Sequence, residues 1–426
     1  MKSLNQSVLE IYKGDVAQNQ IWVISELYYP EETSTGAFLT QTAEGLAKRF
    51  PVRVLCSQPT YGARGRSAPV NEVRNGVKVH RCWGTTFNKD ILPLRLVNMV
   101  TITLSIMFSA ILRIRAEDCV LVVTNPPTLP LVAALACFLH RAKCVLIVHD
   151  VYPEVLIATG VFRRSSLLTR AIEWTTRALY RRMTRVVVLG RDMKALVQSK
   201  LPTAGDLITT IPNWADLDLV KPLPRNENPL LRDLRLAERF VIQYSGNIGR
   251  THGIENLVLC AEQFANNANV HFLFIGFGGK KVWLAETVKE RRLTNITVLD
   301  YRLRSELSNS LNACDIGIIS FTRGMAGVSV PSRMYNVMAT GKPIIAAADT
   351  VSELAQVIRE EDIGWVVEPG NVAALKSAII EAMGSPDRLI QMGLRARRVA
   401  ETKYSFERAN ASYTNLVYSL YQQECQ

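Results

Sequence analysis

Two glycine-rich segments in the second half of the chain carry residue types that bind phosphate groups. The first, YSGNIGRTHG at 244–253, contains Gly246, Asn247, Gly249 and Arg250, and the second, IGFGGK at 275–280, contains Gly276 and Gly278. Glycine lets the backbone approach a ligand closely, and a guanidinium or a helix start adds donors for a diphosphate. Neither segment matches the P-loop or the GxGxxG fingerprint. A tight turn explains each segment alone, but their occurrence together favours nucleotide binding.

A histidine and an aspartate, His149 and Asp150, directly follow the apolar run CVLIV at 144–148. Ligands bind beyond the carboxyl ends of strands in open parallel sheets, so His149 is expected to face a cleft. A structural histidine within the core is the alternative. The five histidines show no metal-ligand spacing, and no Ser-His-Asp arrangement is evident. We therefore expect neither a hydrolytic nor a zinc-dependent mechanism.

Short apolar runs alternate with helix-like segments along all 426 residues. The runs IWVIS at 21–25, CVLVVT at 119–124 and FVIQY at 240–244 are typical of strands buried in a parallel sheet. A segment rich in proline, asparagine and aspartate at 211–228 interrupts this alternation, which then starts again. We expect an α/β protein with two Rossmann-like, doubly wound domains that face a cleft.

The net charge of +12 predicts an anionic partner, such as a phosphorylated substrate or a membrane surface. Nucleic acid is disfavoured because aromatic residues are not interleaved with the basic ones as stacking requires. The eight cysteines are scattered without a CxxC pair, which is typical of core residues in a reducing, cytoplasmic protein. The first twenty residues are polar and show no cleavable signal peptide.

Two segments indicate contact with a membrane. Leu96–Leu112 is uncharged but shorter than the ~20 residues a span needs, so a buried or interface-seated helix is favoured over a span. The arginine-rich segment 163–191 has a basic stripe on one face if it is helical, with Leu168, Ile172 and Leu179 on the opposite face. The stripe consists of Arg163, Arg170, Trp174, Arg177 and Arg181. Such a stripe suits an anionic bilayer, and a solvated basic face is the equal alternative.

Motifs spread from Trp22 to about Tyr421 resemble those of one enzyme family. They are YPEE at 29–32 with Thr35 and Gly36, TNPP at 124–127, HDVYPE at 149–154, YSGN at 244–247, IGFG at 275–278, PSR at 331–333 and MATGKP at 338–343. The chain resembles family 4 glycosyltransferases of GT-B fold, in particular the bacterial surface-polysaccharide subgroup. Colanic-acid and O-antigen transferases, including fucosyl- and N-acetylfucosaminyl-type members, are similar.

The resemblance implies a division of the chain and roles for its residues. A tail at 1–20 precedes an acceptor-binding domain at 21–215, a linker at 216–228 and a nucleotide-sugar-binding domain at 229–400, and a helix at 401–426 is expected to be able to pack back on the first domain. Gly36 matches the glycine loop near the donor diphosphate, and His149 matches the histidine that contacts the transferred sugar. Glu31, Thr33 and Thr35 then lie on the acceptor side.

Two departures from the family pattern concern charged residues. The usual Arg-plus-Lys pair of the diphosphate loop is replaced by Asn247, Arg250 and His252. The two family glutamates, eight positions apart, fall on Val328 and Asn336. Asn336 can still hydrogen-bond the ribose hydroxyls, but Val328 cannot replace a carboxylate. We expect Ser332 and Arg333 to compensate, with Arg333 neutralising the departing phosphate rather than being a surface arginine at a helix start.

The sequence therefore predicts a glycosyltransferase that moves a sugar from a UDP- or GDP-linked donor to a lipid-linked glycan acceptor. The resemblance implies retention of anomeric configuration and no metal or other cofactor. The basic stripe and the apolar segment 96–112 both suit peripheral attachment to the inner face of the plasma membrane. Two alternatives remain on the same fold: a sugar-nucleotide epimerase, or a catalytically silent nucleotide-sugar-binding subunit.

Overall fold

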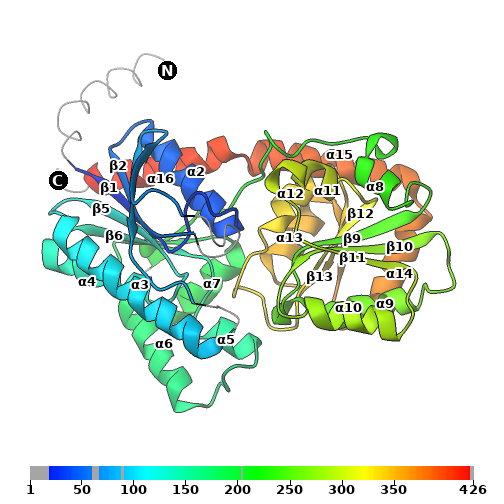
Figure 1. Ribbon diagram of the computed structural model, residues 1–426, viewed down its shortest axis with the longest axis horizontal. Helices are drawn as coiled ribbons and strands as arrows, with labels where there is room; N and C mark the ends of the chain where they lie inside the picture. The colour runs from blue at the N-terminus through cyan, green and yellow to red at the C-terminus, as the bar shows by residue number, and fades with distance from the viewer. Residues whose placement is uncertain (1–18, 60–66, 88–90, 203–204, 423–426) are drawn as a thin grey trace.

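The N-terminal domain contains one eight-stranded sheet (Figure 1). The computed structural model describes residues 19–59, 67–87, 91–202 and 205–422, so most of the expected tail, and Cys425, lie outside it. The sheet order is β3-β4-β2-β1-β5-β6-β7-β8, and only the β3–β4 pair is antiparallel. The strands are β1 (Ile21–Ile24), β2 (Val52–Ser57), β3 (Asn71–Arg74), β4 (Val77–Cys82), β5 (Cys119–Val123), β6 (Lys143–Val148), β7 (Arg185–Val188) and β8 (Ile208–Thr210).

Helices cover both faces of this sheet. They are α2 (Ser34–Ala47), α3 (Leu92–Arg113), α4 (Leu129–His140), α5 (Glu154–Ala158), α6 (Leu167–Tyr180) and α7 (Arg191–Lys200), with a 3₁₀ turn η1 (Gly205–Leu207). Leu39 and Leu46 of α2 pack with Ile21 and Val23 on one face. Residues of α3, α4, α6 and α7 pack with Trp22 on the other, so the strands are buried on both sides, as continuous apolar runs require.

The C-terminal domain contains a six-stranded, wholly parallel sheet of order β11-β10-β9-β12-β13-β14. Its strands are β9 (Phe240–Asn247), β10 (Val270–Phe277), β11 (Ile296–Leu299), β12 (Ile316–Ser320), β13 (Ile344–Ala347) and β14 (Gly364–Val367). Its helices are α8 (Pro229–Asp233), α9 (Ile254–Glu262), α10 (Lys281–Glu290), α11 (Leu307–Leu311), α12 (Arg333–Ala339), α13 (Glu353–Glu361), α14 (Val372–Met383) and α15 (Pro386–Lys403), with 3₁₀ turns η2 (Arg225–Glu227), η3 (Arg250–His252) and η4 (Arg304–Glu306). Two doubly wound α/β domains are thus confirmed.

The last helix, α16 (Phe406–Gln422), returns to the N-terminal domain and packs beside α2 (Figure 1). Its buried residues Tyr413, Val417 and Leu420 belong to the same core cluster as β1. The chain crosses between the domains twice, and the crossings touch, because the Ala215 N–H donates to the Tyr404 carbonyl at 2.8 Å. The C-terminal domain is therefore connected to the N-terminal domain by two chain segments that lie side by side.

The apolar segment 96–112 lies within α3, which packs on the N-terminal sheet through Ile102, Ile106 and Ala110. Its outer side exposes Phe108 and Leu112. Among the described residues one helix, Pro93–Arg113, is long and apolar enough to span a membrane by length and composition, although only 22% of that stretch is buried. The contacts with the sheet agree with the favoured alternative, a buried or interface-seated helix, in its partly buried form.

Candidate active site

Loops at the carboxyl ends of β6 and β12 bring the two domains into direct contact. Asp150 and Ser329 form an isolated antiparallel bridge, and the Val151 N–H donates to the Val328 carbonyl at 2.9 Å. The position that lacks the first family glutamate, Val328, therefore contacts the segment that carries His149.

His149 is half-buried, and a hydrogen bond from its backbone N–H fixes its position at this contact. Its N–H and that of Asp150 both donate to Thr124 Oγ1, at 3.1 and 3.2 Å. Burial lowers the pKa of His149 to about 4, so its imidazole is neutral at physiological pH. Burial also raises the pKa of Asp150, an effect that a hydrogen bond with Ser329 partly offsets. A neutral imidazole here can donate one hydrogen bond without adding charge.

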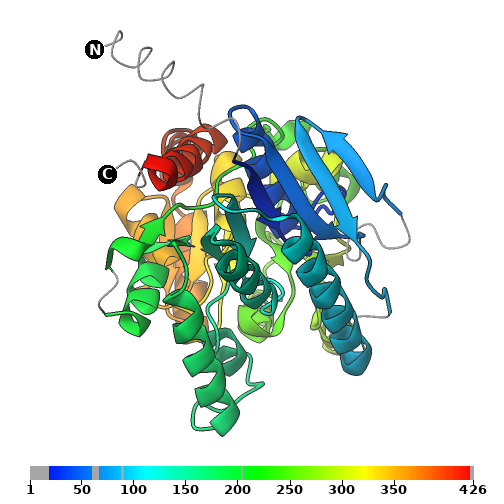
Figure 2. The same cartoon turned by 90° about the vertical axis from the view of Figure 1, so that its left-hand side faces the viewer.

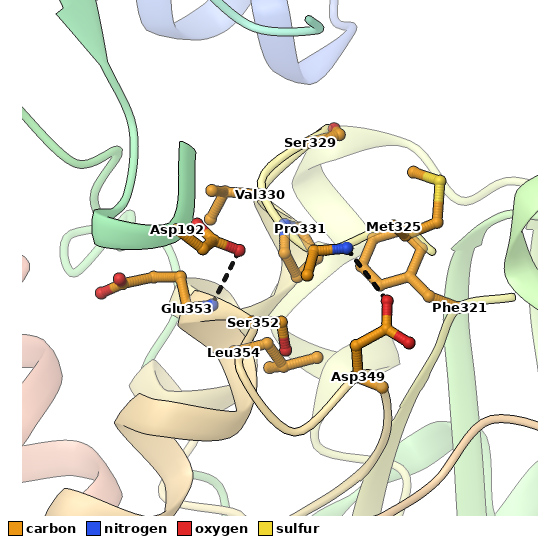
Figure 3. A pocket seen from close by; sticks show the side chains of 12 residues that line it. Asp192, Phe321, Met325, Ser329, Val330, Pro331, Asp349, Ser352, Glu353 and Leu354 are labelled. Carbon is orange, nitrogen blue, oxygen red and sulfur yellow. Dashed lines mark hydrogen bonds between the residues drawn. The ribbon is translucent and has the colours of Figure 1, made fainter. Parts of the chain in front are cut away.

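A second contact between the domains surrounds a narrow pocket at the start of α7 (Figure 3). Asp192 Oδ2 accepts the N–H groups of Gly327 at 2.8 Å and Glu353 at 2.9 Å. On the far side of the pocket, Asp349 Oδ2 accepts the Ala326 N–H at 3.0 Å. The pocket volume is about 10 Å³, room for no more than a water molecule. The hydrogen bonds around the pocket join the two domains.

Arg333 lies at the carboxyl ends of the central strands of the C-terminal sheet. It is the first residue of α12, and its guanidinium lies over the Tyr244 ring, 4.7 Å from the centroid. The guanidinium also packs against Gly246, because a Cβ added to Gly246 would lie 3.4 Å from Arg333 Cζ. Arg333 Nη1 is buried and has no hydrogen-bond partner among the described residues. No carboxylate in the described part of the chain pairs with Arg333, so its positive charge is available to an anionic ligand.

His252 lies behind Arg333 and stays neutral. Its ring stacks on Phe321 with centroids 5.4 Å apart. Burial first, and then the positive charges of Arg333 and Lys280, lower the pKa of His252 to about 2. It therefore cannot supply the positive charge of the lysine that the family carries in this loop. Lys280, which is paired with Glu255, is the second cation near the ring.

The two glycine-rich segments end adjacent strands, and Gly276 pairs in register with Gly246. A Cβ on Gly276 would lie 1.9 Å from the Gly246 carbonyl oxygen, and the φ of Gly276 is +155°. Gly278 is similarly crowded by Asn247 Oδ1 at 2.4 Å. These glycines are therefore required by strand packing, which is independent of any contact with phosphate.

The remaining donor-side candidates differ in their availability. Asn247 and Arg250 are exposed, and Gly249 precedes η3. Ser332 is half-buried at the start of α12 and makes no capping hydrogen bond there. Asn336 Oδ1 accepts the Asp216 N–H from the linker at 3.0 Å, which leaves its amide nitrogen for a ligand.

On the N-terminal side, α2 begins at Ser34. Gly36 is thus the third helical residue, and its N–H donates to Thr33 Oγ1 at 3.3 Å. The first N–H groups of α2, from Ser34 and Thr35, remain open to a ligand because they have no partner within the helix. Glu31 is buried, and the Glu32 carbonyl accepts a hydrogen bond from Tyr301 of the other domain at 3.4 Å.

The basic stripe on α6 differs from the expected one in two respects. The helix covers Leu167–Tyr180, so Arg163 precedes it and Arg181 only caps its end. Leu168, expected on the buried side, is exposed, because α6 projects beyond the sheet at this end. All five stripe residues, Arg163, Arg170, Trp174, Arg177 and Arg181, are nevertheless exposed.

Comparison with known proteins decides the family. A Glycosyl transferase 4-like domain matches residues 35–214, and Glycosyl transferases group 1 matches residues 231–399. The probable glycosyltransferase WbjE of Pseudomonas aeruginosa is 32% identical over 395 residues, which cover 91% of this chain and 94% of WbjE. The chain belongs to the family 4/group 1 glycosyltransferases. A further relative of this glycosyltransferase, WcaI of Escherichia coli, is named for colanic acid biosynthesis and is 25% identical over 380 residues, 84% of this chain and 91% of WcaI.

Solved structures share the fold over almost the whole chain. Sucrose-phosphate synthase of Thermosynechococcus elongatus has a TM-score of 0.76 at 16% identity, with 95% of this chain and 100% of that chain covered. Anabaena HepE in complex with UDP has a TM-score of 0.69 at 15% identity, with 94% and 100% covered. At such identities the likeness shows the fold alone, and it confirms the GT-B arrangement expected from the sequence.

Several residues near the glycosyltransferase site were not assigned from the sequence. Tyr244 supports Arg333, and Lys280 stands beside His252. Ser329 and Tyr301 bridge the domains. Lys280 could have been assigned from the sequence, because it ends the second glycine-rich segment. The other three residues are identified only by their tertiary contacts. No group of three or more His, Cys, Asp or Glu side chains in the described ranges is placed to hold a metal.

The three histidines with strongly lowered pKa values predict how the stability of this glycosyltransferase depends on pH. Burial lowers the pKa to about 4 in His149, about 2 in His252 and about 4 in His271. In the unfolded chain a histidine titrates near 6.5. Below that pH the unfolded state binds more protons, so the free energy of unfolding should fall by up to ~1.4 kcal/mol per pH unit for each histidine, until the folded pKa is reached.

Denaturant unfolding of the wild type and of His149→Gln at pH 7.5, 6.5 and 5.5 measures this effect. The difference between the two proteins removes the contribution of the carboxylates. The variant should lose stability less steeply below pH 6.5, by about one proton. Parallel curves would show that His149 titrates normally in the folded protein.

Proposed function

We propose that this glycosyltransferase transfers a sugar from a nucleoside diphosphate-linked donor to a lipid-linked glycan acceptor in surface-polysaccharide biosynthesis. The observation that carries the donor half is Arg333, whose buried guanidinium nitrogen lacks a partner among the described residues, at the carboxyl ends of β9 and β10. Ligands of open parallel sheets bind at such strand ends. The UDP complexes of HepE support this choice, because they place a nucleotide in a protein of the same fold.

The proposed chemistry is electrostatic. Breaking the bond between the anomeric carbon and the phosphate oxygen leaves a nucleoside diphosphate whose added charge must be stabilised. We assign this stabilisation to Arg333 and to the exposed Arg250 of the first glycine-rich segment, since Lys280 is already paired with Glu255. We propose that they act without a divalent ion and with retention at the anomeric carbon. Neutral His149 donates a hydrogen bond to the transferred sugar from the opposite domain.

The acceptor half is supported by the surface of the N-terminal domain. The helices α3, α4 and α6 lie side by side (Figure 2). They expose large apolar residues, among them Phe108 of α3, Phe138 of α4 and Leu167 of α6. Exposed arginines of the α6 stripe adjoin them. Apolar side chains with basic neighbours are suited to an anionic membrane interface, where a lipid-linked acceptor resides. We propose peripheral attachment there, at the inner face of the plasma membrane, and relatives such as WcaI support the polysaccharide pathway.

Thermal unfolding with added nucleotides tests the donor half. A ligand that binds only the folded state raises stability by about 2.7 kcal/mol at a hundred times its Kd. Either UDP or GDP should raise the Tm, and Arg333→Lys should weaken the shift while keeping its nucleotide preference. No shift with either nucleotide, or an equal shift in Arg333→Ala, would contradict the proposed donor site.

A catalytically silent nucleotide-sugar-binding subunit is the second candidate. Val328 in place of the first family glutamate favours it, and Val328 is buried with its carbonyl engaged by Val151. Turnover separates the candidates, because a silent subunit binds the nucleotide sugar without ever releasing nucleoside diphosphate in the presence of a lipid-linked acceptor. An epimerase would alter the sugar while leaving it attached to the nucleotide.

A further inference from the structure

A groove in the N-terminal domain lies between α5, α6 and α7 and is distinct from the donor site. We call it the α6 groove. Its volume is about 490 Å³, and Pro153 and Glu154 line its inner end. Pro153 is three residues after Asp150, a distance that the chain spans in at most ~11 Å. The α6 groove therefore starts beside the segment that carries His149.

The floor of the α6 groove is a buried ion-pair cluster. Lys200 is only 3% exposed, and its ammonium donates to Glu154 Oε1 at 2.5 Å and to Glu173 Oε2 at 2.7 Å. Glu154 Oε2 is buried and has no hydrogen-bond partner among the described residues. The cluster fixes α5, α6 and α7 relative to one another, so the groove has a rigid base.

The rim of the α6 groove carries more positive charge than the carboxylates of this cluster neutralise. Arg164, Arg170 and Arg177 line it. Arg177 pairs with Glu173 at 2.8 Å, whereas Arg164 and Arg170 pair with no carboxylate in the described part of the chain. Four cations face two carboxylates in the groove, which leaves an excess of two positive charges. Two unpaired arginines beside a cavity fit a phosphate or diphosphate group, which guanidinium groups bind in a bidentate manner.

Apolar surface continues from the rim of the groove. Trp174, which lines it, is 73% exposed, and Leu167 on the same helix is 81% exposed. Phe138 on the neighbouring helix α4 is 75% exposed. A positively charged, anion-binding site next to a large exposed apolar surface fits one class of ligand, an amphiphile with a phosphate headgroup and a hydrocarbon chain.

We infer that the α6 groove binds the phosphate or diphosphate of the lipid-linked acceptor. Arg164 and Arg170 hold the phosphate, and the hydrocarbon chain lies along Trp174 and Leu167 towards the membrane. The glycan extends past Pro153 to His149. This inference rests on the proposed function, because it assigns the acceptor that the function requires. It divides the α6 stripe, since Arg163 and Arg181 do not line the groove and contact only the membrane surface.

Titration calorimetry with farnesyl diphosphate, a short soluble analogue of a lipid diphosphate, tests the inference on the full chain without any donor. The double variant Arg164→Gln/Arg170→Gln should bind farnesyl diphosphate at least about tenfold more weakly than the wild type. Arg182→Gln is the matched control, because Arg182 is also exposed and follows α6 but does not line the groove. Farnesol and inorganic pyrophosphate, each lacking one half of the ligand, should both bind more weakly to the wild type.

Each other result overturns the inference. Equal affinity for pyrophosphate would show a site for free phosphate, and equal losses in Arg182→Gln would show only an effect of net charge. If the double variant lost affinity for vesicles of phosphatidylglycerol but kept farnesyl diphosphate, the arginines would serve the bulk membrane. The proposed function fails separately: binding of farnesyl diphosphate that depends on Arg164 and Arg170, in a protein that never turns over UDP- or GDP-sugars, would preserve the groove and exclude the transferase.

Discussion

Replacing Arg333 with alanine should lower turnover about 10²–10³-fold while the protein remains folded. This is the usual effect of removing one preorganised donor from a developing negative charge. The guanidinium is buried beside Gly246 and over Tyr244, with Nη1 unpartnered among the described residues, so its main role cannot be an ion pair within the folded chain. Release of nucleoside diphosphate in the presence of acceptor measures the effect.

Two further variants sharpen the Arg333 experiment. Arg333→Lys keeps the charge but loses the planar fork, so its turnover should lie between those of wild type and alanine. Arg398→Ala removes an exposed arginine on α15 and should leave turnover and Tm near wild type. Near-normal turnover in Arg333→Ala, with donor still bound, would remove Arg333 from the reaction.

Gly276→Ala should destabilise the C-terminal domain by about 2–6 kcal/mol, the sum of overpacking and backbone strain. The new methyl group would lie 1.9 Å from the Gly246 carbonyl oxygen, so β9 and β10 would have to separate at the proposed donor site. Denaturant unfolding should show a lower midpoint, and nucleotide binding should weaken with it.

The matched control for this prediction is three residues away. Gly279 belongs to the same segment, and a Cβ there would meet no atom within 4 Å. Gly279→Ala should therefore change stability by no more than about 0.5 kcal/mol. If both variants unfolded at the same denaturant concentration, the strand contact at Gly276 would be less tight than the structure shows.

The fold was predictable because its strands are continuous apolar runs with turn residues between them. The strand expected at 240–244 is β9, and the one expected at 119–124 is β5, each found within a few residues. The edge strand β3 could not be expected in the same way. Its residues Asn71–Arg74 alternate between exposed and half-buried, so it carries no apolar run.

The site was only partly predictable because its side chains meet through tertiary contacts. The sequence singled out Arg333 from its position, but that it fills the space left by Gly246 depends on how α12 packs. The engagement of Asn336 by the linker at Asp216 has no local signal, since 120 residues separate them. The α6 stripe followed helical periodicity, but which arginines line a groove depends on α5 and α7. The catalytic role of Arg333 and the donor-binding role of Asn336 stay predictions.

The return of α16 to the N-terminal domain affects how the chain responds to mechanical force. A pull applied between β1 and α16 acts on one core, because Ile21 and Val417 belong to the same cluster. The C-terminal domain is inserted between β1 and α16 in the chain, and the two segments that connect it to the N-terminal domain are hydrogen-bonded to each other at Ala215 and Tyr404. The C-terminal sheet therefore carries no load until the N-terminal core yields. A single-molecule pulling trace should therefore show the N-terminal domain rupturing first and the C-terminal domain unfolding only afterwards.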